Sequence, residues 1–136
     1  MPLQRLRSKL DAEREIRLKA AITALLVTGT SANATSTRRT TPKAYAALER
    51  MHQEGLLSGS EGLLRGRHLS RVNLSNMRLD STNFTRANLW NANLSGADLA
   101  KCWFQMADMD HTALVGADLS GADLFNAWLR NANLTN

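Results

Sequence analysis

The chain has 136 residues, 43% of them apolar, and a formal net charge of +5 at pH 7, which suits one domain or one solenoid with an attached segment. Its single cysteine excludes an internal disulfide, and no apolar run approaches the roughly eighteen residues that a membrane span requires. Residues 1–66 hold eleven basic and six acidic side chains, whereas residues 67–136 hold six of each. We therefore expect two units with different electrostatic behaviour.

Residues 3–28 are predicted to form a helix that ends at Gly29. Charged residues fall mostly away from one apolar face, although Arg14 interrupts it. The default expectation is a helix that packs against the rest of the chain or supports oligomerisation. The leucine and isoleucine residues near that face are Leu3, Leu6, Leu10, Leu18, Ile22 and Leu25.

Two other roles for this helix remain open. Its basic residues could contact an anionic membrane or a nucleic acid, although acidic residues such as Asp11 and Glu13 dilute the positive field. Residues 20–34 faintly resemble a secretory signal with a cleavage site, but the charged stretch before them is long and contains acids. We therefore expect a cytoplasmic protein, with export as the alternative.

Residues 29–41 lack apolar periodicity and are predicted to be a linker. A second helix is predicted at 42–54, because Thr41 can cap it, Pro42 suits its first position and Gly55 can end it. We expect this helix to cap the array that follows, so that residues 1–66 form a helical N-terminal segment. The leucines expected to cover the first coil are Leu56, Leu57, Leu63 and Leu64.

From Arg67 to Asn136 an apolar residue stands at every fifth position, fourteen times in succession. Residues five apart make no stripe on a helix, and they alternate between the faces of a flat strand. The chain must therefore turn once per repeat, so that each of these central residues returns to the same interior. The central residues are Leu69, Leu74, Leu79, Phe84, Leu89, Leu94, Leu99, Phe104, Met109, Leu114, Leu119, Leu124, Leu129 and Leu134.

The other positions of the repeat fit such turns. A small residue, usually Ala, stands two positions before most central residues and should also point inward. Asn or Asp often stands one position before and can bond neighbouring backbone groups. Two positions after the central residue the chain often places Gly or Asn, which tolerate corner geometry: Gly96, Gly116, Gly121, Asn76, Asn91, Asn126 and Asn131.

Units such as Ala87-Asn88-Leu89, Ala97-Asp98-Leu99 and Ala122-Asp123-Leu124 closely resemble the A-[D/N]-L-x-x signature of the pentapeptide-repeat family. The resemblance covers residues 67–136 and implies a mainly β fold, a right-handed quadrilateral β-helix with four repeats per coil. Fourteen repeats then give about 3.5 coils, a stub roughly 17 Å long at the spacing of adjacent strands. Trp103 and Trp128 depart from the signature, where Asn or Asp is usual.

The sequence shows no catalytic or cofactor motif, so we expect no enzyme, no cofactor and no metal site. The histidines His52, His68 and His111 lack ligand spacing and are expected at the surface. The recurring aspartates are expected to be turn residues. Cys102 falls at an inward position and is expected to be a packed thiol.

Residues twenty apart should stack, which sorts the outward positions into four faces. Two adjacent faces then carry large apolar side chains where the family usually places polar ones. We expect these residues to bind a protein partner or a second copy, with coverage by residues 1–28 as the alternative. The candidate interaction surface consists of Trp90, Trp103, Met106, Phe125 and Trp128.

The sequence therefore favours a non-enzymatic protein–protein interaction or scaffold module. Some family members protect type II topoisomerases by mimicking duplex DNA, but a short and neutral array suits that activity poorly. A membrane- or nucleic-acid-associated protein acting through the basic first helix is a second alternative. The last coil, around Leu134, has no capping element in the sequence and is another candidate site of self-association.

Overall fold

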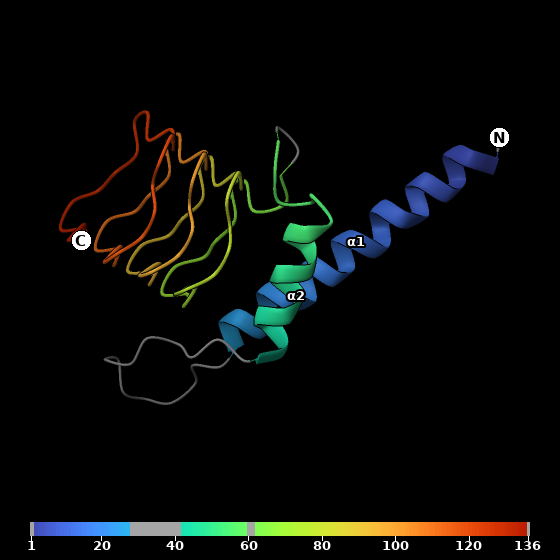
Figure 1. Ribbon diagram of the computed structural model, residues 1–136. Coiled ribbons are helices and arrows are strands. Elements are labelled where there is room, and N and C mark those ends of the chain that lie inside the picture. Colours follow the sequence, from blue (N-terminus) through green and yellow to red (C-terminus); the bar gives the residue numbers. More distant parts are fainter. Residues whose placement is uncertain (1, 28–41, 60–61, 136) are drawn as a thin grey trace.

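The computed structural model describes residues 2–27, 42–59 and 62–135. Helices α1 (Pro2–Val27) and α2 (Pro42–Gln53) lie side by side at one end of a stack of coils, and the C-terminal residues lie at the other end (Figure 1). Both helices occupy ranges that the sequence predicts as helical. The predicted linker at 29–41 lies outside the described residues, as does much of the signal-like stretch.

Helix α1 is long because it is rich in Leu, Arg, Lys, Glu and Ala, and because its proline stands at the first position. Of its side chains from residue 3 to residue 17, only that of Glu15 is even half-buried. Leu3, Leu6 and Leu10 are exposed, so this half of the helix does not pack its apolar stripe on its own chain, and the alternative, oligomerisation, stays a prediction. Among the described residues, α1 approaches the rest of the chain through the Glu15–Arg67 pair, through α2 and across a cavity beside the turn after α2.

Helix α2 ends in a Schellman motif. The Leu56 N–H donates to the Met51 carbonyl at 3.0 Å, and the Gly55 N–H donates to the His52 carbonyl at 2.9 Å. The motif requires a left-handed residue after the helix, which Gly55 supplies with φ 71°. The turn carries the chain from α2 onto the first coil.

The repeats stack in coils of twenty residues. Parallel bridges join each coil to the next, from His68–Asn88 to Ala113–Asn133. The Leu69 N–H donates to the Asn88 carbonyl at 2.7 Å, and equivalent bonds recur along the array. Asn and Asp side chains bond the backbone two residues later, as expected; Asn88 Oδ1, for example, accepts from the Trp90 N–H at 3.0 Å.

The array is less regular as a β structure than expected, because its bridges are isolated single residues. No extended strand occurs among residues 62–135. The cause is a corner with positive φ two residues after each central residue, from Arg71 to Asn131, which interrupts extended backbone every five residues. Several corners hold residues that are not usual there, namely Arg71, Ser81, Arg86, Lys101, Met106 and His111.

The interior of the coils is apolar, as the five-residue period predicts. Phe84 and Phe104 stack with centroids 5.1 Å apart and an interplanar angle of 1°, and the small residues before the central positions are buried in most coils. Leu48 and Met51 of α2, together with Leu57 and Leu64, extend this core over the first coil. At the opposite end Leu134 is exposed.

Candidate interaction surface

Four large apolar side chains stand out from two successive coils. Their exposed fractions are 39% for Trp103, 46% for Met106, 66% for Phe125 and 60% for Trp128. Burying them would remove considerable apolar area from water, which is the main driving force of most protein association. We call these four residues the aromatic surface.

The ladder of the coils brings the four residues together. The Met106 N–H donates to the Phe125 carbonyl at 2.9 Å, so these two residues lie directly against each other. Trp103 is bridged to Asp123, two residues before Phe125, and Trp128 is bridged to Asp108, two residues after Met106. The aromatic surface therefore spans two coils and the corner at Met106.

Trp90, the fifth predicted residue, lies one coil earlier and is half-buried. The Arg71 guanidinium sits 5.0 Å from the centroid of its ring, and the His111 ring meets it edge-on at 6.2 Å. Its ring already contacts side chains of its own chain. We therefore place Trp90 beside the aromatic surface but not within it.

Acidic side chains flank the aromatic surface. Asp123 accepts a hydrogen bond from Gln105 Nε2 at 2.6 Å, and Asp108 accepts from the Asp110 N–H at 3.1 Å. The nearest arginine, Arg130, lies 5.8 Å from the Trp128 centroid, but Asp110 neutralises it at 2.6 Å. Around this surface stand three carboxylates, those of Asp108, Asp110 and Asp123, and one guanidinium, that of Arg130, which pairs with Asp110 and also interacts with Asp108. Negative charge therefore exceeds positive charge around the aromatic surface.

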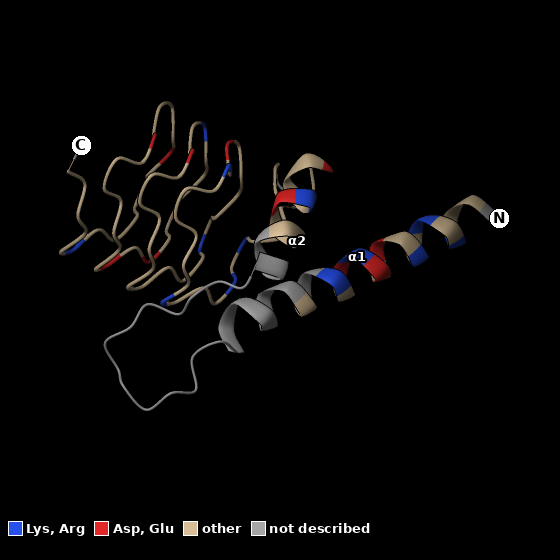
Figure 2. Cartoon of the chain, turned by 60° about the horizontal axis from the view of Figure 1, so that its bottom comes forward, with Lys and Arg blue, Asp and Glu red and all other residues tan. Residues whose placement is uncertain are grey.

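Charges elsewhere on the coils are interspersed. Basic and acidic residues both occur along the coils (Figure 2), six of each between residues 67 and 136. Such an arrangement lacks the continuous acidic rod that resembles DNA. In α1, by contrast, basic residues dominate the end nearest the N-terminus (Figure 2).

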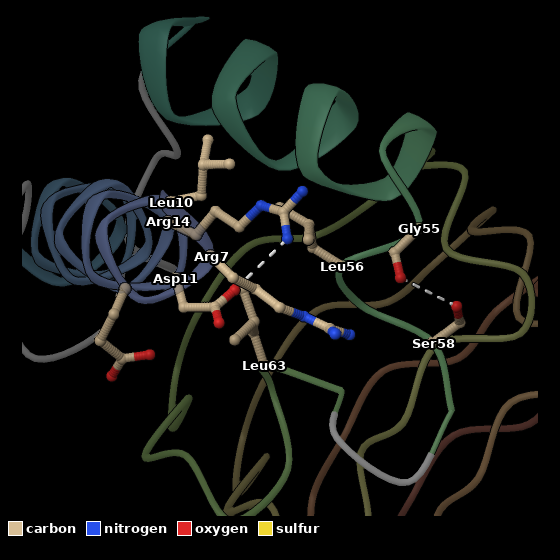
Figure 3. A pocket seen from close by; sticks show the side chains of 9 residues that line it. Arg7, Leu10, Asp11, Arg14, Gly55, Leu56, Ser58 and Leu63 are labelled. Carbon is tan, nitrogen blue, oxygen red and sulfur yellow. Dashed lines mark hydrogen bonds and ion pairs between the residues drawn. The ribbon is translucent and has the colours of Figure 1, made fainter. Parts of the chain in front are cut away.

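A cavity of about 680 Å³ lies between α1 and the turn that follows α2 (Figure 3). The Arg14 guanidinium and the Asp11 carboxylate, 3.5 Å apart, pair across its α1 wall, and Leu56 and Leu63 form the opposite wall. The charged side chains thus include a paired set of opposite sign. Together with Arg7 and Glu15, this pair gives the lining two basic and two acidic side chains, so their formal charges cancel.

The Cys102 thiol and the His52 imidazole, groups that serve as nucleophiles or metal ligands in other proteins, make structural contacts in this chain. The Cys102 thiol is buried and donates to the Leu79 carbonyl at 3.0 Å, and burial raises its pKa to about 12. His68 and His111 are exposed as expected, but the expectation is wrong for His52. Its Nε2 lies 2.9 Å from the Asp80 carbonyl oxygen and 3.2 Å from the Asp80 carboxylate, because α2 packs on the first coil.

Within residues 2–27, 42–59 and 62–135, no three His, Cys, Asp or Glu side chains gather in a way that could hold a metal ion. In the same residues, neither helix combines the length and the apolar character needed to cross a membrane. The aromatic surface is therefore the feature of the described chain best suited to binding.

Comparison with known proteins points to one family. Similar solved structures include a pentapeptide repeat protein from the Arabidopsis thaliana thylakoid lumen, 26% identical, with a TM-score of 0.39 over 57% of this chain and 69% of that one. A protein from Nostoc PCC 7120 is 27% identical, with a TM-score of 0.35 over 67% of this chain and 84% of that one.

HetL, a Nostoc protein involved in heterocyst differentiation regulation, is 32% identical over 51% of this chain, with a TM-score of 0.30. This chain spans only 35% of the length of HetL. No curated protein sequence matches the chain. The family model described as pentapeptide repeats (8 copies) matches residues 68–105 and 104–136, and the chain therefore belongs to the pentapeptide-repeat family.

Proposed function

We propose that this protein is a non-enzymatic binding module whose aromatic surface receives another protein. The coils, which we take to form a right-handed four-sided β-helix, hold the surface rigid, because backbone hydrogen bonds join its two coils to each other and Trp103 to Thr82 of the preceding coil. The observation that carries the proposal is the joint exposure of Trp103, Met106, Phe125 and Trp128. Rigid aromatic anchors lose little conformational entropy on binding and dominate the energetics of many interfaces.

The position of these residues in the repeat supports the proposal. Trp103 and Trp128 stand one residue before their central residues, where nine of the fourteen repeats have Asn or Asp. An Asn or Asp there bonds the backbone two residues later, and a tryptophan gives up that bond. A contact with a partner would compensate for the loss.

Mimicry of DNA is disfavoured because the array carries as many basic as acidic residues. A gyrase supercoiling assay distinguishes the two functions. We expect no protection of the topoisomerase at micromolar concentrations of this protein. Protection that survives loss of the aromatic surface would favour the mimic.

The proposal is tested by comparing partners captured by three immobilised forms of the full chain. The first is the wild type, and the second carries Trp103→Ser, Phe125→Ser and Trp128→Ser. The third, Val115→Ser, is a matched control, because Val115 is 42% exposed on a different side of the array. We expect the wild type and Val115→Ser to retain a common set of proteins that the triple variant retains at least about tenfold more weakly. Equal recovery by all three forms would show that the aromatic surface is not a binding face.

A further inference from the structure

The chain carries a second exposed apolar face, on the N-terminal half of α1. Leu3, Leu6 and Leu10 are 82%, 56% and 50% exposed, and their spacing of three and four residues places them on one side of the helix. This spacing is the one by which amphipathic helices dock into apolar surfaces of other proteins.

The position of α1 separates this face from the aromatic surface of its own chain. The Arg67 guanidinium at the start of the coils holds Glu15 at 2.8 Å, and beyond this contact the helix runs away from the array towards the N-terminus (Figures 1 and 2). The Trp128 coil lies towards the opposite end of the stack. A helix held in this way can reach an aromatic surface only on another copy.

The two faces are complementary in charge. The first ten residues contain Arg5, Arg7 and Lys9 and no acidic residue, and all three basic side chains are exposed. The aromatic surface is flanked by the carboxylates of Asp108 and Asp123. A basic apolar helix laid on this surface would pair opposite charges around an apolar centre.

The two faces also match in size. The segment from Leu3 to Leu10 is about 10 Å long, and a helix with its side chains is about 10 Å across. The aromatic surface extends over two coils, about 4.8 Å apart, and around the corner at Met106. We propose that residues 3–10 of α1 from one copy dock on the aromatic surface of a second copy. This inference rests on the proposed function, since it names the occupant of the same surface.

The inference is tested by sedimentation of full-length variants. The helix variant carries Leu3→Ser and Leu6→Ser, and the surface variant carries Phe125→Ser and Trp128→Ser. Their matched controls are Ile16→Ser, exposed on a different face of α1, and Val115→Ser. All four sets of changes lie at exposed positions, and circular dichroism checks that each variant folds.

We expect the wild type and both controls to associate at about 100 μM, whereas the helix and surface variants alone associate at least about tenfold more weakly. An equimolar mixture of these two variants should form a one-to-one complex, because the surface variant keeps an intact helix and the helix variant keeps an intact surface. Added salt should weaken the association. Recovery in the mixture is the specific signature of helix-to-surface docking.

Three outcomes would overturn the inference. A helix variant that associates like the wild type shows that α1 is not the occupant, although the surface remains a binding face. A mixture that stays monomeric indicates contact between like surfaces. A monomeric wild type that binds vesicles containing phosphatidylserine, through Leu3 and Leu6, assigns the helix to membranes. The capture experiment with the triple variant tests the proposed function separately in each case.

Discussion

Asp110 and Arg130, twenty residues apart, form an ion pair with two hydrogen bonds between successive coils. The Arg130 backbone N–H and Nε each donate to the Asp110 carboxylate at 2.8 Å, and Nη2 lies 2.6 Å from Oδ2. The side-chain hydrogen bond from Arg130 is the main reason why the pKa of Asp110 lies below its usual value. The pair joins two successive coils and lies beside the aromatic surface.

Replacing Asp110 by Asn should lower the melting temperature at neutral pH. Because the folded-state pKa is lowered, the charged carboxylate stabilises the fold above the unfolded pKa of about 3.8, and this stabilisation is lost as pH falls through the lowered value. Thermal unfolding as a function of pH should therefore show wild type and Asp110→Asn converging in acid. Arg130→Gln should give the same loss, and the double variant little more. A constant difference at all pH values would contradict the assignment.

The Cys102 thiol should react very slowly in the folded protein. Its pKa of about 12, against a usual 9.0, reduces the thiolate fraction about a thousandfold near neutral pH, and burial blocks access as well. Titration with a chromogenic disulfide reagent measures the rate. Protein unfolded in guanidinium is the control and should react as a free thiol. Native reactivity close to that of the unfolded chain would mean that the coil opens around Cys102.

Replacing Gly62 by Ala should weaken the contact between the segment that follows α2 and the first coil. A Cβ at Gly62 would lie 2.7 Å from both the Leu57 carbonyl oxygen and the Asn83 Cβ, so backbone must move. We expect a loss of about 1–3 kcal/mol in unfolding free energy. Amide exchange should quicken at Asn83, whose N–H donates to Leu57 at 2.7 Å.

Gly66→Ala is the matched control for this change. A Cβ at Gly66 meets nothing within 4 Å, although its φ of 69° is strained for alanine. It should cost about 1 kcal/mol and leave the exchange of Asn83 unchanged. If both variants quicken Asn83 equally, the close approach at Gly62 does not hold the segment after α2 on the first coil.

Replacing Glu15 by Gln should loosen α1 and spare the coils. The Glu15–Arg67 pair is about one-third exposed, so it contributes at most about 1 kcal/mol. Hydrogen exchange in α1 should rise by up to about fivefold, with the melting temperature of the array nearly unchanged. Glu13→Gln, at an exposed position, is the control. Equal effects of the two substitutions would show that the ion pair does not anchor the helix.

The sequence predicts the coils well because every five-residue repeat places the same types of side chain at the same structural positions. Leu89 and Cys102 are buried and Asn88 bonds its neighbouring backbone, as each position in the repeat requires. The same period forces Lys101 and Met106 into left-handed corners that their residue types alone would not predict. There the hydrogen bonds to the next coil outweigh the local preference.

Contacts between distant segments could not be predicted in this way. The sequence contains no periodic signal that pairs His52 with Asp80 or Glu15 with Arg67. Leu3 and Leu6 fit an apolar stripe, but a stripe does not reveal whether anything covers it. The same limit applies to Trp90, whose partial burial depends on Arg71 from the preceding coil.

The twenty-residue ladder constrains how this chain can change in length. Loss of five residues after Leu114 would turn every later residue by one side of the coil, so that Phe125 would leave the side of Trp103 and Trp128 would take the place of Asp123 beside Trp103. Loss or gain of twenty residues would keep every residue on its original side of the coil. Insertions and deletions in this gene should therefore be tolerated by the fold in steps of five codons, but by the aromatic surface only in steps of twenty.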